Sequence, residues 1–489
     1  MLNLRIQPDV IINALLRTEA VTYSAFALEE RISMKYISRC RMSILAATEP
    51  IAVETTPRAA ASQRLMSVDA LRGFDMFWII GAGSLVTALN RMSQTGPTRF
   101  LANQLEHADW EGFRFYDLIF PLFLFLVGVS TVFSLSKLID QGGRSEALRR
   151  VIRRGILLFV IGIIYSGGFT NSWPNMRLMG VLNRIALAYL FGGLLFCFFK
   201  PRALVAICAG LLIGYWALMT FVPIRDIQLT PENISRLAAQ AGDTETADYF
   251  AQRDFVNPST VKNSSAWAGT EKLFYATTNR VTGKYAKGYN FSDHTDFQYL
   301  PGKKWDNFFD PEGFVGTIPA VATCLLGIFA GFLLKNQTIP DLRKVTYLLI
   351  FGLAAATAGW LWNFQFPVIK KIWTSSYVLV AGGYSALLLA AFYLVVDIWK
   401  FQKWCQPFVW IGMNSITIYL AANIIGPAIG GGPGGFGKIA TRLAGGDVRA
   451  FLNSNVSQGL GDLVVAIIGL LLAFWFVHFL YRRKIFLRF

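Results

Sequence analysis

Residues 115–138, FYDLIFPLFLFLVGVSTVFSLSKL, decide the fold class. No charged side chain lies between Asp117 and Lys137, and roughly 20 apolar residues in a helix cross a hydrocarbon core about 30 Å thick. The sequence predicts an all-α polytopic membrane protein with about ten transmembrane helices. The predicted spans are residues 74–90, 115–138, 155–166, 181–199, 203–221, 314–334, 345–362, 377–398, 408–425 and 463–481.

The composition agrees with this class. Hydrophobic residues make up 54% of the 489 residues and charged residues 16%, whereas soluble proteins carry nearer a quarter charged residues. The formal net charge is +16, but basic residues gather beside apolar runs, as at 149–154 and 482–484, where cytoplasmic membrane anchors lie. No groove-reading motif accompanies them, so we expect membrane lipids and not nucleic acid as partners. The five cysteines form no CxxC pair and the chain has three histidines, so no metal is expected.

The chain divides into a tail and a membrane domain. Residues 1–63 contain no span-length apolar run and predict a disordered tail, followed by the transmembrane domain at 64–489. The bias of Lys and Arg among the short loops places both termini in the cytoplasm, and residues 223–313 then form a long extracytoplasmic loop or cap. The aromatic residues of this loop fit either a small folded cap or a platform on which sugar rings stack.

Ionisable and polar groups inside an apolar run are costly, so each is a functional candidate. Asp69 and Arg72 lie three residues apart, on one helical face, at the start of the first span. They form a helix-start pair, or Arg72 meets the phosphates of a nucleotide-like cofactor. Arg184 requires an anion, supplied by a carboxylate or a ligand. Asn414 and Ser415, near the ninth span, either bond between helices or contact a ligand.

A second cluster surrounds the histidine nearest to a span start. His107 has Glu106, Asp109 and Trp110 beside it, and Asp117 follows at the start of the second span. Carboxylates and an aromatic neighbour are surroundings in which an imidazole can be tuned as a base. A structural role for a histidine in such a loop is the alternative.

Two more charged groups lie near predicted outer ends of spans. Glu312 precedes the run 314–334, and Lys370 is followed by Lys371 before the run 377–398. The lysines would attract an anionic substrate or anchor the helix.

Six stretches, in order, resemble the heparan-α-glucosaminide N-acetyltransferase family, which is lysosomal in animals and has many bacterial relatives. They are SVDALRG at 67–73, HADWEG at 107–112 with DLIFP at 117–121, MGVLNR at 179–184, DPEGFVGT at 310–317, GMNS at 412–415 and RKIF at 483–486. The resemblance covers the chain from about residue 64 onward. It implies acetyl transfer from cytoplasmic acetyl-CoA to an amino sugar across the membrane, without a metal.

The resemblance also implies roles for individual residues. His107 matches the catalytic histidine of the family, and Asp109 or Asp117 would orient its ring. We assign acetyl-CoA binding to Asp69, Arg72, Arg184, Asn414 and Ser415, and acceptor binding to Trp110, Glu312 and Lys370. The sequence departs from the animal members near residues 80–82, where they carry an asparagine; Asn90 and Asn103 are the alternatives.

Several alternatives stay open at this stage. Transfer is either direct, with His107 as the base, or passes through an acetyl-histidine intermediate. The acceptor is glucosamine, a similar amino sugar or another cell-surface glycan. The rival class is a transporter or flippase of a sugar or lipid-linked sugar. We expect location in a bacterial inner membrane, and the large membrane surface is compatible with a homodimer.

Overall fold

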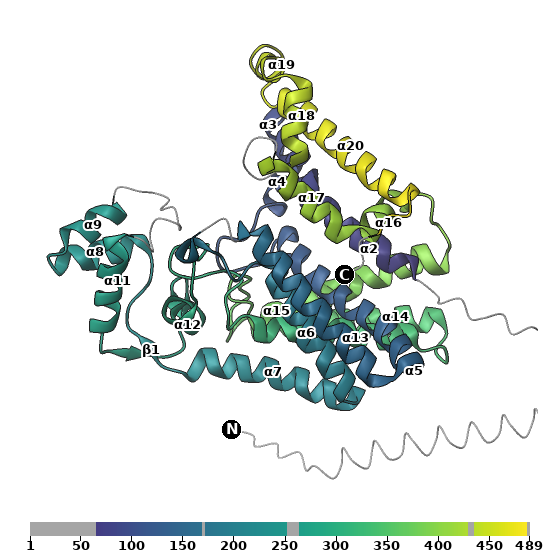
Figure 1. Cartoon of the computed structure of the whole chain (residues 1–489), viewed down its shortest axis with the longest axis horizontal. Coiled ribbons are helices and arrows are strands. Elements are labelled where there is room, and N and C mark those ends of the chain that lie inside the picture. Colours follow the sequence, from purple (N-terminus) through teal and green to yellow (C-terminus); the bar gives the residue numbers. More distant parts are fainter. Residues whose placement is uncertain (1–64, 169–171, 252–263, 429–434, 487–489) are drawn as a thin grey trace, which may run out of the picture. The chain divides into compact units, whose positions relative to one another are not determined.

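The computed structural model describes residues 65–168, 172–251, 264–428 and 435–486, which are mostly helical (Figure 1). The predicted tail lies outside the described residues. The membrane domain begins with α2 (Met66–Phe77), the π-helical turn η1 (Trp78–Ala82), α3 (Gly83–Met92) and α4 (Gly96–Gln104). It continues with α5 (Phe115–Tyr165), η3 (Trp173–Asn175), α6 (Val181–Phe198) and α7 (Pro201–Phe221). After the segment 223–313 follow α13 (Thr317–Lys335), α14 (Asp341–Trp362), α15 (Ser375–Phe392), η4 (Tyr393–Ile398), α16 (Gln406–Met413), α17 (Ser415–Ala428), α18 (Gly435–Ala444), α19 (Gly446–Phe451), η5 (Leu452–Val456) and α20 (Leu460–Arg482).

Seven described helices are long and apolar enough to cross a membrane: α5, α6, α7, α13, α14, α15 extended through η4, and α20. Six of them each match one predicted span. The predicted spans 115–138 and 155–166 both lie in α5, which has 51 residues and is interrupted at Gly143 (φ 80°, ψ 177°). Leu135, before this break, and Val151, after it, lie in one buried cluster. The count of about ten crossings remains a prediction.

The other two predicted spans fall on interrupted helices. Within 74–90 the helix widens into η1, where Gly81 adopts φ 140° between α2 and α3. Within 408–425 α16 ends at Met413, and α17 begins after Asn414 (φ −121°, ψ 25°). Interrupted helices leave backbone groups without helical partners, and membrane proteins accommodate them inside protein or beside a cavity. Both interruptions flank the cavity described below.

Glycines fix the position of α2 against α16. A side-chain carbon at Gly73 would overlap the carbonyl oxygen of Phe408, and one at Gly412 would overlap that of Asp69. Small residues permit this close backbone approach, which is typical of packed membrane helices. The turns of α2 that carry Asp69 and Arg72 are therefore held firmly against α16.

Residues 223–313 contain a folded segment with its own core. Here β1 (Ile224–Arg225) pairs antiparallel with β2 (Arg280–Val281), and β3 (Tyr285–Ala286) with β4 (Tyr289–Asn290). The helices are α8 (Pro231–Gln240), α9 (Thr244–Ala251), α11 (Ser265–Ala276) and α12 (Phe291–Tyr299).

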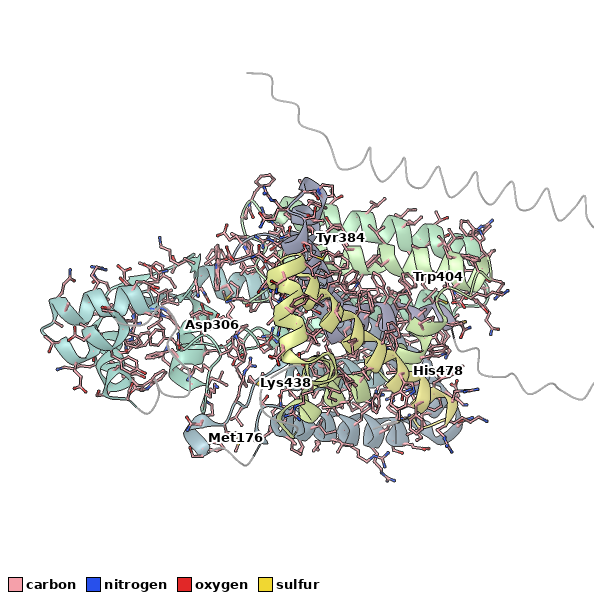
Figure 2. The ribbon with its side chains drawn as sticks, turned by 90° about the horizontal axis from the view of Figure 1, so that it is seen from above. Met176, Asp306, Tyr384, Trp404, Lys438 and His478 are labelled. Carbon is pink, nitrogen blue, oxygen red and sulfur yellow. The ribbon has the colours of Figure 1, made fainter. Side chains whose placement is uncertain are left out.

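The aromatic residues of this segment divide into two groups. Trp267 and Phe308 belong to its buried cluster, while Tyr275, Tyr299 and Trp305 are exposed. The buried group favours a folded cap, and the exposed group leaves the sugar platform a prediction. Figure 2 shows the side chains, with Asp306 in this segment and His478 on α20.

Candidate active site

Asp117 holds the ring of His107. Asp117 is the third residue of α5, and its buried carboxylate accepts hydrogen bonds through Oδ2 from the backbone N–H groups of Ala108 (3.1 Å) and Arg114 (3.0 Å). Its Oδ1 lies 2.9 Å from Nδ1 of His107. An ionised carboxylate accepts only, so Nδ1–H donates to Asp117 and Nε2 keeps its lone pair.

Lys370 lies over the same ring. Its Nζ is 2.8 Å from Nδ1 and 3.2 Å from Nε2 of His107, and 3.4 Å from Oδ1 of Asp117. The two ring nitrogens flank Cε1, so an atom this close to both must sit above the ring and not in its plane. The Nε2 lone pair, which lies in the ring plane, therefore points away from Lys370. Burial lowers the pKa of the Lys370 ammonium, and Asp117 opposes this shift.

Backbone pairing brings the two loops together. Gly112 donates its N–H to the carbonyl of Val368 (2.9 Å), and Glu111 forms an antiparallel bridge with Ile369. This pairing joins the loop before α5 to the loop between α14 and α15. The approach of Lys370 to His107 thus follows from a backbone contact that charge patterns do not reveal.

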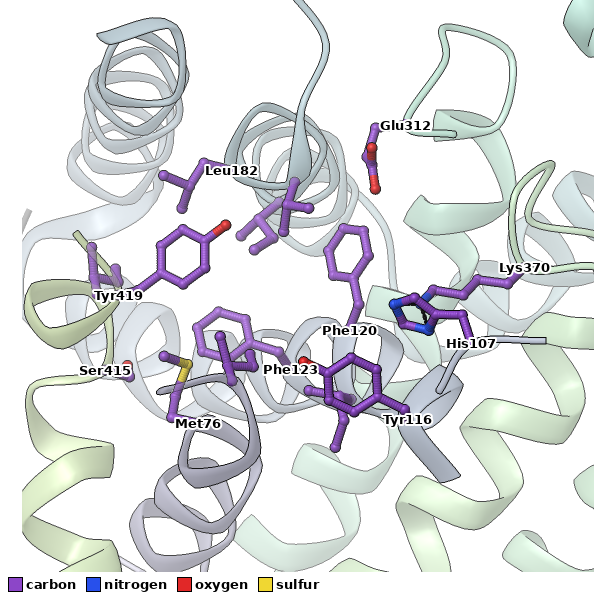
Figure 3. Close-up of a pocket in the computed structure, with 15 residues that line it drawn as sticks. Met76, His107, Tyr116, Phe120, Phe123, Leu182, Glu312, Lys370, Ser415 and Tyr419 are labelled. Carbon is purple, nitrogen blue, oxygen red and sulfur yellow. Dashed lines mark hydrogen bonds between the residues drawn. The ribbon is translucent and has the colours of Figure 1, made fainter. Parts of the chain in front are cut away.

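A cavity of about 200 Å³ lies beside His107 and Lys370 (Figure 3). His107, Lys370 and Glu312 lie on one side of it, and Ser415 and Tyr419 on the other. The rest of the wall is largely apolar and comes from α2, η1, α5, α6 and α17: Met76, Ile79, Tyr116, Ile119, Phe120, Phe123, Val181, Leu182, Ile185 and Ile416. Sites for whole drug-sized ligands usually have about 300–1,000 Å³, so this volume suits the reacting ends of two substrates.

Glu312 is held in the wall by Arg177. The Arg177 guanidinium binds Asp310 through Nε (2.8 Å) and Nη2 (2.6 Å), and its Nη2 lies 2.7 Å from Oε2 of Glu312. Burial raises the pKa of Glu312, and the charge of Arg177 opposes that shift. The cavity therefore offers a carboxylate on the same side as His107. Sequence reasoning missed Arg177, which lies two residues before the MGVLNR stretch.

Arg184 belongs with this polar side. Its guanidinium is buried, donates from Nη2 to the carbonyl of Gly313 (3.1 Å), and lies 4.9 Å from the ring centroid of Trp373. Among the described residues no carboxylate pairs with it at ion-pair distance. The structure thus places Arg184 beside the loop of Glu312 and not with Asp69 and Arg72.

The remaining residues assigned to acetyl-CoA lie along α2 and at the α16–α17 interruption. Arg72 pairs with Asp69 (3.6 Å) and donates a hydrogen bond to Ser130. It lies one helical turn before Met76, which lines the cavity. Asn414 is buried, and its amide atoms have no hydrogen-bond partner among the described residues. Ser415 itself lines the cavity.

Asp109 and Trp110, also assigned from the sequence, do not line the cavity. Asp109 is exposed, and it is Asp117 that contacts His107. Trp110 donates its indole N–H to the carbonyl of Tyr285 (2.8 Å) and so ties the histidine loop to the folded segment. Asn90 and Asn103 do not line the cavity either. Within the described part of the chain, no group of three His, Cys, Asp or Glu side chains is placed to hold a metal ion.

Comparison with known proteins shows what the chain is similar to. Residues 64–251 match the model described as heparan-alpha-glucosaminide N-acetyltransferase, catalytic. The chain is 26% identical over 420 residues to the mouse protein heparan-alpha-glucosaminide N-acetyltransferase, and 25% identical over 417 residues to the human protein of that name. Each alignment covers 77% of this chain and 56% of the relative's length. The family resemblance indicated by the six sequence stretches is therefore confirmed.

Proposed function

From this relationship to the heparan-α-glucosaminide N-acetyltransferases, we propose that the chain is a transmembrane N-acetyltransferase. It moves the acetyl group of acetyl-CoA to the amine of a terminal glucosamine or a similar amino sugar. The observation that carries the proposal is the cavity in which Asp117 orients His107, with Lys370 and Glu312 beside it.

His107 is the base in this proposal. An amino sugar arrives as an ammonium ion, and the carboxylate of Glu312 attracts it to the His107 side of the cavity. Nε2 takes one proton and passes it to solvent, and the neutral amine attacks the thioester carbonyl. The nitrogen then gives its second proton to Nε2 as the amide forms. General-base assistance of this kind is worth about 10²–10⁴-fold in rate.

Lys370 stabilises the developing negative charge. As the amine adds to the thioester, the carbonyl oxygen becomes an oxyanion, and a cation held in a fixed position stabilises it. The Lys370 ammonium lies against the imidazole, so it is close to the place where the bond forms. The same geometry would also serve a route through acetyl-histidine. Direct transfer needs no separately stabilised intermediate, and we favour it.

The donor approaches from the side of the cavity formed by α2 and α17. The cavity holds the thioester and part of the pantetheine arm, and the nucleotide remains outside. Arg72 would meet the phosphates from the cytoplasm, with both termini on that side, as the distribution of basic residues predicts. The acceptor then reaches His107 from the extracytoplasmic side. The segment 223–313 lies on that side in this proposal. A bacterial inner membrane and a homodimer complete the proposal.

The test is acetyl transfer by purified protein from labelled acetyl-CoA to glucosamine. We expect label on the sugar with the wild type and none with His107→Ala. His478→Ala is the matched control because His478 lies on α20 (Figure 2) and does not line the cavity, and it should retain activity.

The other outcomes separate the alternatives. Binding of CoA without transfer to glucosamine would direct the search to other surface glycans as acceptors. A folded protein that neither binds CoA nor transfers acetyl would contradict the enzyme and favour the transporter or flippase.

A further inference from the structure

Acetyl transfer needs an acid as well as a base. The acceptor ammonium loses a proton, while the sulfur of the leaving CoA must gain one. A thiolate is poorly solvated between apolar side chains, and a thiol has an ordinary pKa of about 8.5, so protonation helps the C–S bond to break. The residues discussed above provide the base, His107, but none of them has been assigned as the acid.

Asp75 has the surroundings of such an acid. Its side chain is fully buried in α2, and neither carboxyl oxygen has a hydrogen-bond partner among the described residues. An ionised carboxylate without partners is expensive to bury, so the neutral acid is the favoured form. Arg72 lies one helical turn away and interacts electrostatically with Asp75. Its charge makes the carboxylate tolerable once the proton has left.

Asp75 lies directly behind the wall on the donor side of the cavity and is not itself a lining residue. The next residue, Met76, and Ile79 one turn later both line the cavity, as does Tyr116 of α5. Tyr116 is close enough to Asp75 for the two groups to interact electrostatically, and its ring centroid is 4.8 Å from that of His107. Tyr116 therefore contacts His107 directly and lies within electrostatic range of Asp75.

We infer that Asp75 is the proton donor to the leaving thiolate of coenzyme A. This inference rests on the proposed acetyl transfer. The amine nitrogen forms the new C–N bond, the C–S electron pair moves to sulfur, and the carboxyl proton of Asp75 moves to that sulfur. The ammonium gives one proton to Nε2 of His107, which passes it to solvent, and the nitrogen gives its second proton to the same Nε2 as the amide forms. Solvent then returns a proton to Asp75 and removes one from His107, so the cycle closes without a further reactant.

The experiment varies the leaving group without changing the shape of the donor. Wild type and Asp75→Asn are compared with acetyl-CoA and with its selenoester, in which selenium replaces sulfur. A selenol is more acidic than a thiol, so a selenolate leaves without help from an acid. We expect Asp75→Asn to lower kcat with acetyl-CoA about 10²-fold. With the selenoester its kcat should return to within about tenfold of the wild type, since less acid help is needed.

Two controls protect the interpretation. Asp462→Asn changes a carboxylate that pairs with Arg91 and Arg449 outside the cavity wall, and it should behave as wild type with both donors. Asp75→Leu keeps a similar volume without an acid and should repeat the pattern of Asp75→Asn. Binding of CoA by each variant shows that it is folded.

Other results would overturn the inference. An equal loss with both donors would make Asp75 a packing residue, and no loss with either would remove it from the reaction. Both results presuppose that the wild type transfers acetyl groups. If the wild type itself does not, the proposed function fails before Asp75 is tested.

Discussion

The ammonium of Lys370 lies over the imidazole of His107, 2.8 Å from Nδ1, although 263 residues separate the two in the chain. Asp117 contacts both side chains, through Oδ1, from the first turn of α5. The three residues form one unit in which a carboxylate holds the imidazole and a cation lies beside it. Each can be tested separately because the chain supplies a close neighbour as the control.

Asp117→Asn should lower kcat/KM by about 10²-fold or more, the range of general-base catalysis. Asparagine has one side-chain oxygen, and its NH₂ group cannot accept a hydrogen bond. The two backbone N–H groups that Asp117 binds would therefore compete with Nδ1–H of His107 for that oxygen. The ring would then lose its fixed tautomer. Steady-state kinetics with both substrates measure the effect.

Asp109→Asn is the control for that change. Asp109 is exposed, so its variant should stay within about threefold of the wild type, as expected for a surface change. A larger loss from Asp109→Asn than from Asp117→Asn would contradict the orientation of the ring by Asp117.

Lys370→Met should lower kcat about 10²–10³-fold with a smaller change in KM, because the cation is needed where the oxyanion develops. Lys371→Met is its neighbour and control. Lys371 pairs with Asp306 of the folded segment (2.6 Å) and points to a different partner. Its variant should keep kcat. Equal losses from the two variants would assign Lys370 to general anchoring of the loop.

The pH profile gives an independent test of Lys370. Burial lowers the pKa of its ammonium from the ordinary 10.5, so activity should fall at a lower alkaline pH than an exposed lysine would give. Lys370→Arg keeps a positive charge throughout this range. It should retain part of the activity and lose the alkaline fall. If the fall persists in the arginine variant, another group is responsible for it.

Glu312→Gln should raise KM for the amino-sugar acceptor about tenfold and leave KM for acetyl-CoA near the wild-type value. The physical reason is loss of one charge interaction with the ammonium, of the order of 1–2 kcal/mol in a partly buried site. The two Michaelis constants measured separately provide the check. A rise in KM for acetyl-CoA alone would place Glu312 on the acetyl-CoA side of the cavity.

The apolar runs could be predicted because membrane crossing depends on local length and composition. The interruptions at Gly81 and Asn414 could not, since a glycine or an asparagine inside an apolar run is equally compatible with a continuous helix. Their conformations depend on how α2, α16 and α17 pack. The sequence consequently predicted two spans where the structure has pairs of shorter helices beside the cavity.

The candidate site was predictable in part for a related reason. His107 and Asp117 are ten residues apart, and a carboxylate at the start of a helix commonly turns back on the preceding loop. Lys370 reaches His107 and Asp117 because Glu111 pairs with Ile369 through the backbone. No local sequence pattern predicts this pairing. Asp75 did leave a signal, a carboxylate inside the first apolar run, where ionisable groups are costly.

The folded segment 223–313 should show two opposing pH effects on stability. Burial lowers the pKa of His294 from 6.5 to about 4, so between these values the unfolded chain binds more protons and stability rises with pH. Burial raises the pKa of Asp296 from 3.8 to about 7. Over that range the folded chain binds more protons, so stability falls as pH rises.

Single substitutions should separate these contributions. His294→Gln can still donate to the carbonyl of Ile227, which His294 contacts at 3.0 Å, but does not titrate. Relative to the wild type, its melting temperature should fall as pH rises from about 4 to 7, where the Asp296 contribution remains. Asp296→Asn should show the opposite slope between about pH 4 and 6.5, where the His294 contribution remains. Thermal melting in detergent at several pH values measures both slopes, and slopes of the same sign in the two variants would contradict the burial of these groups.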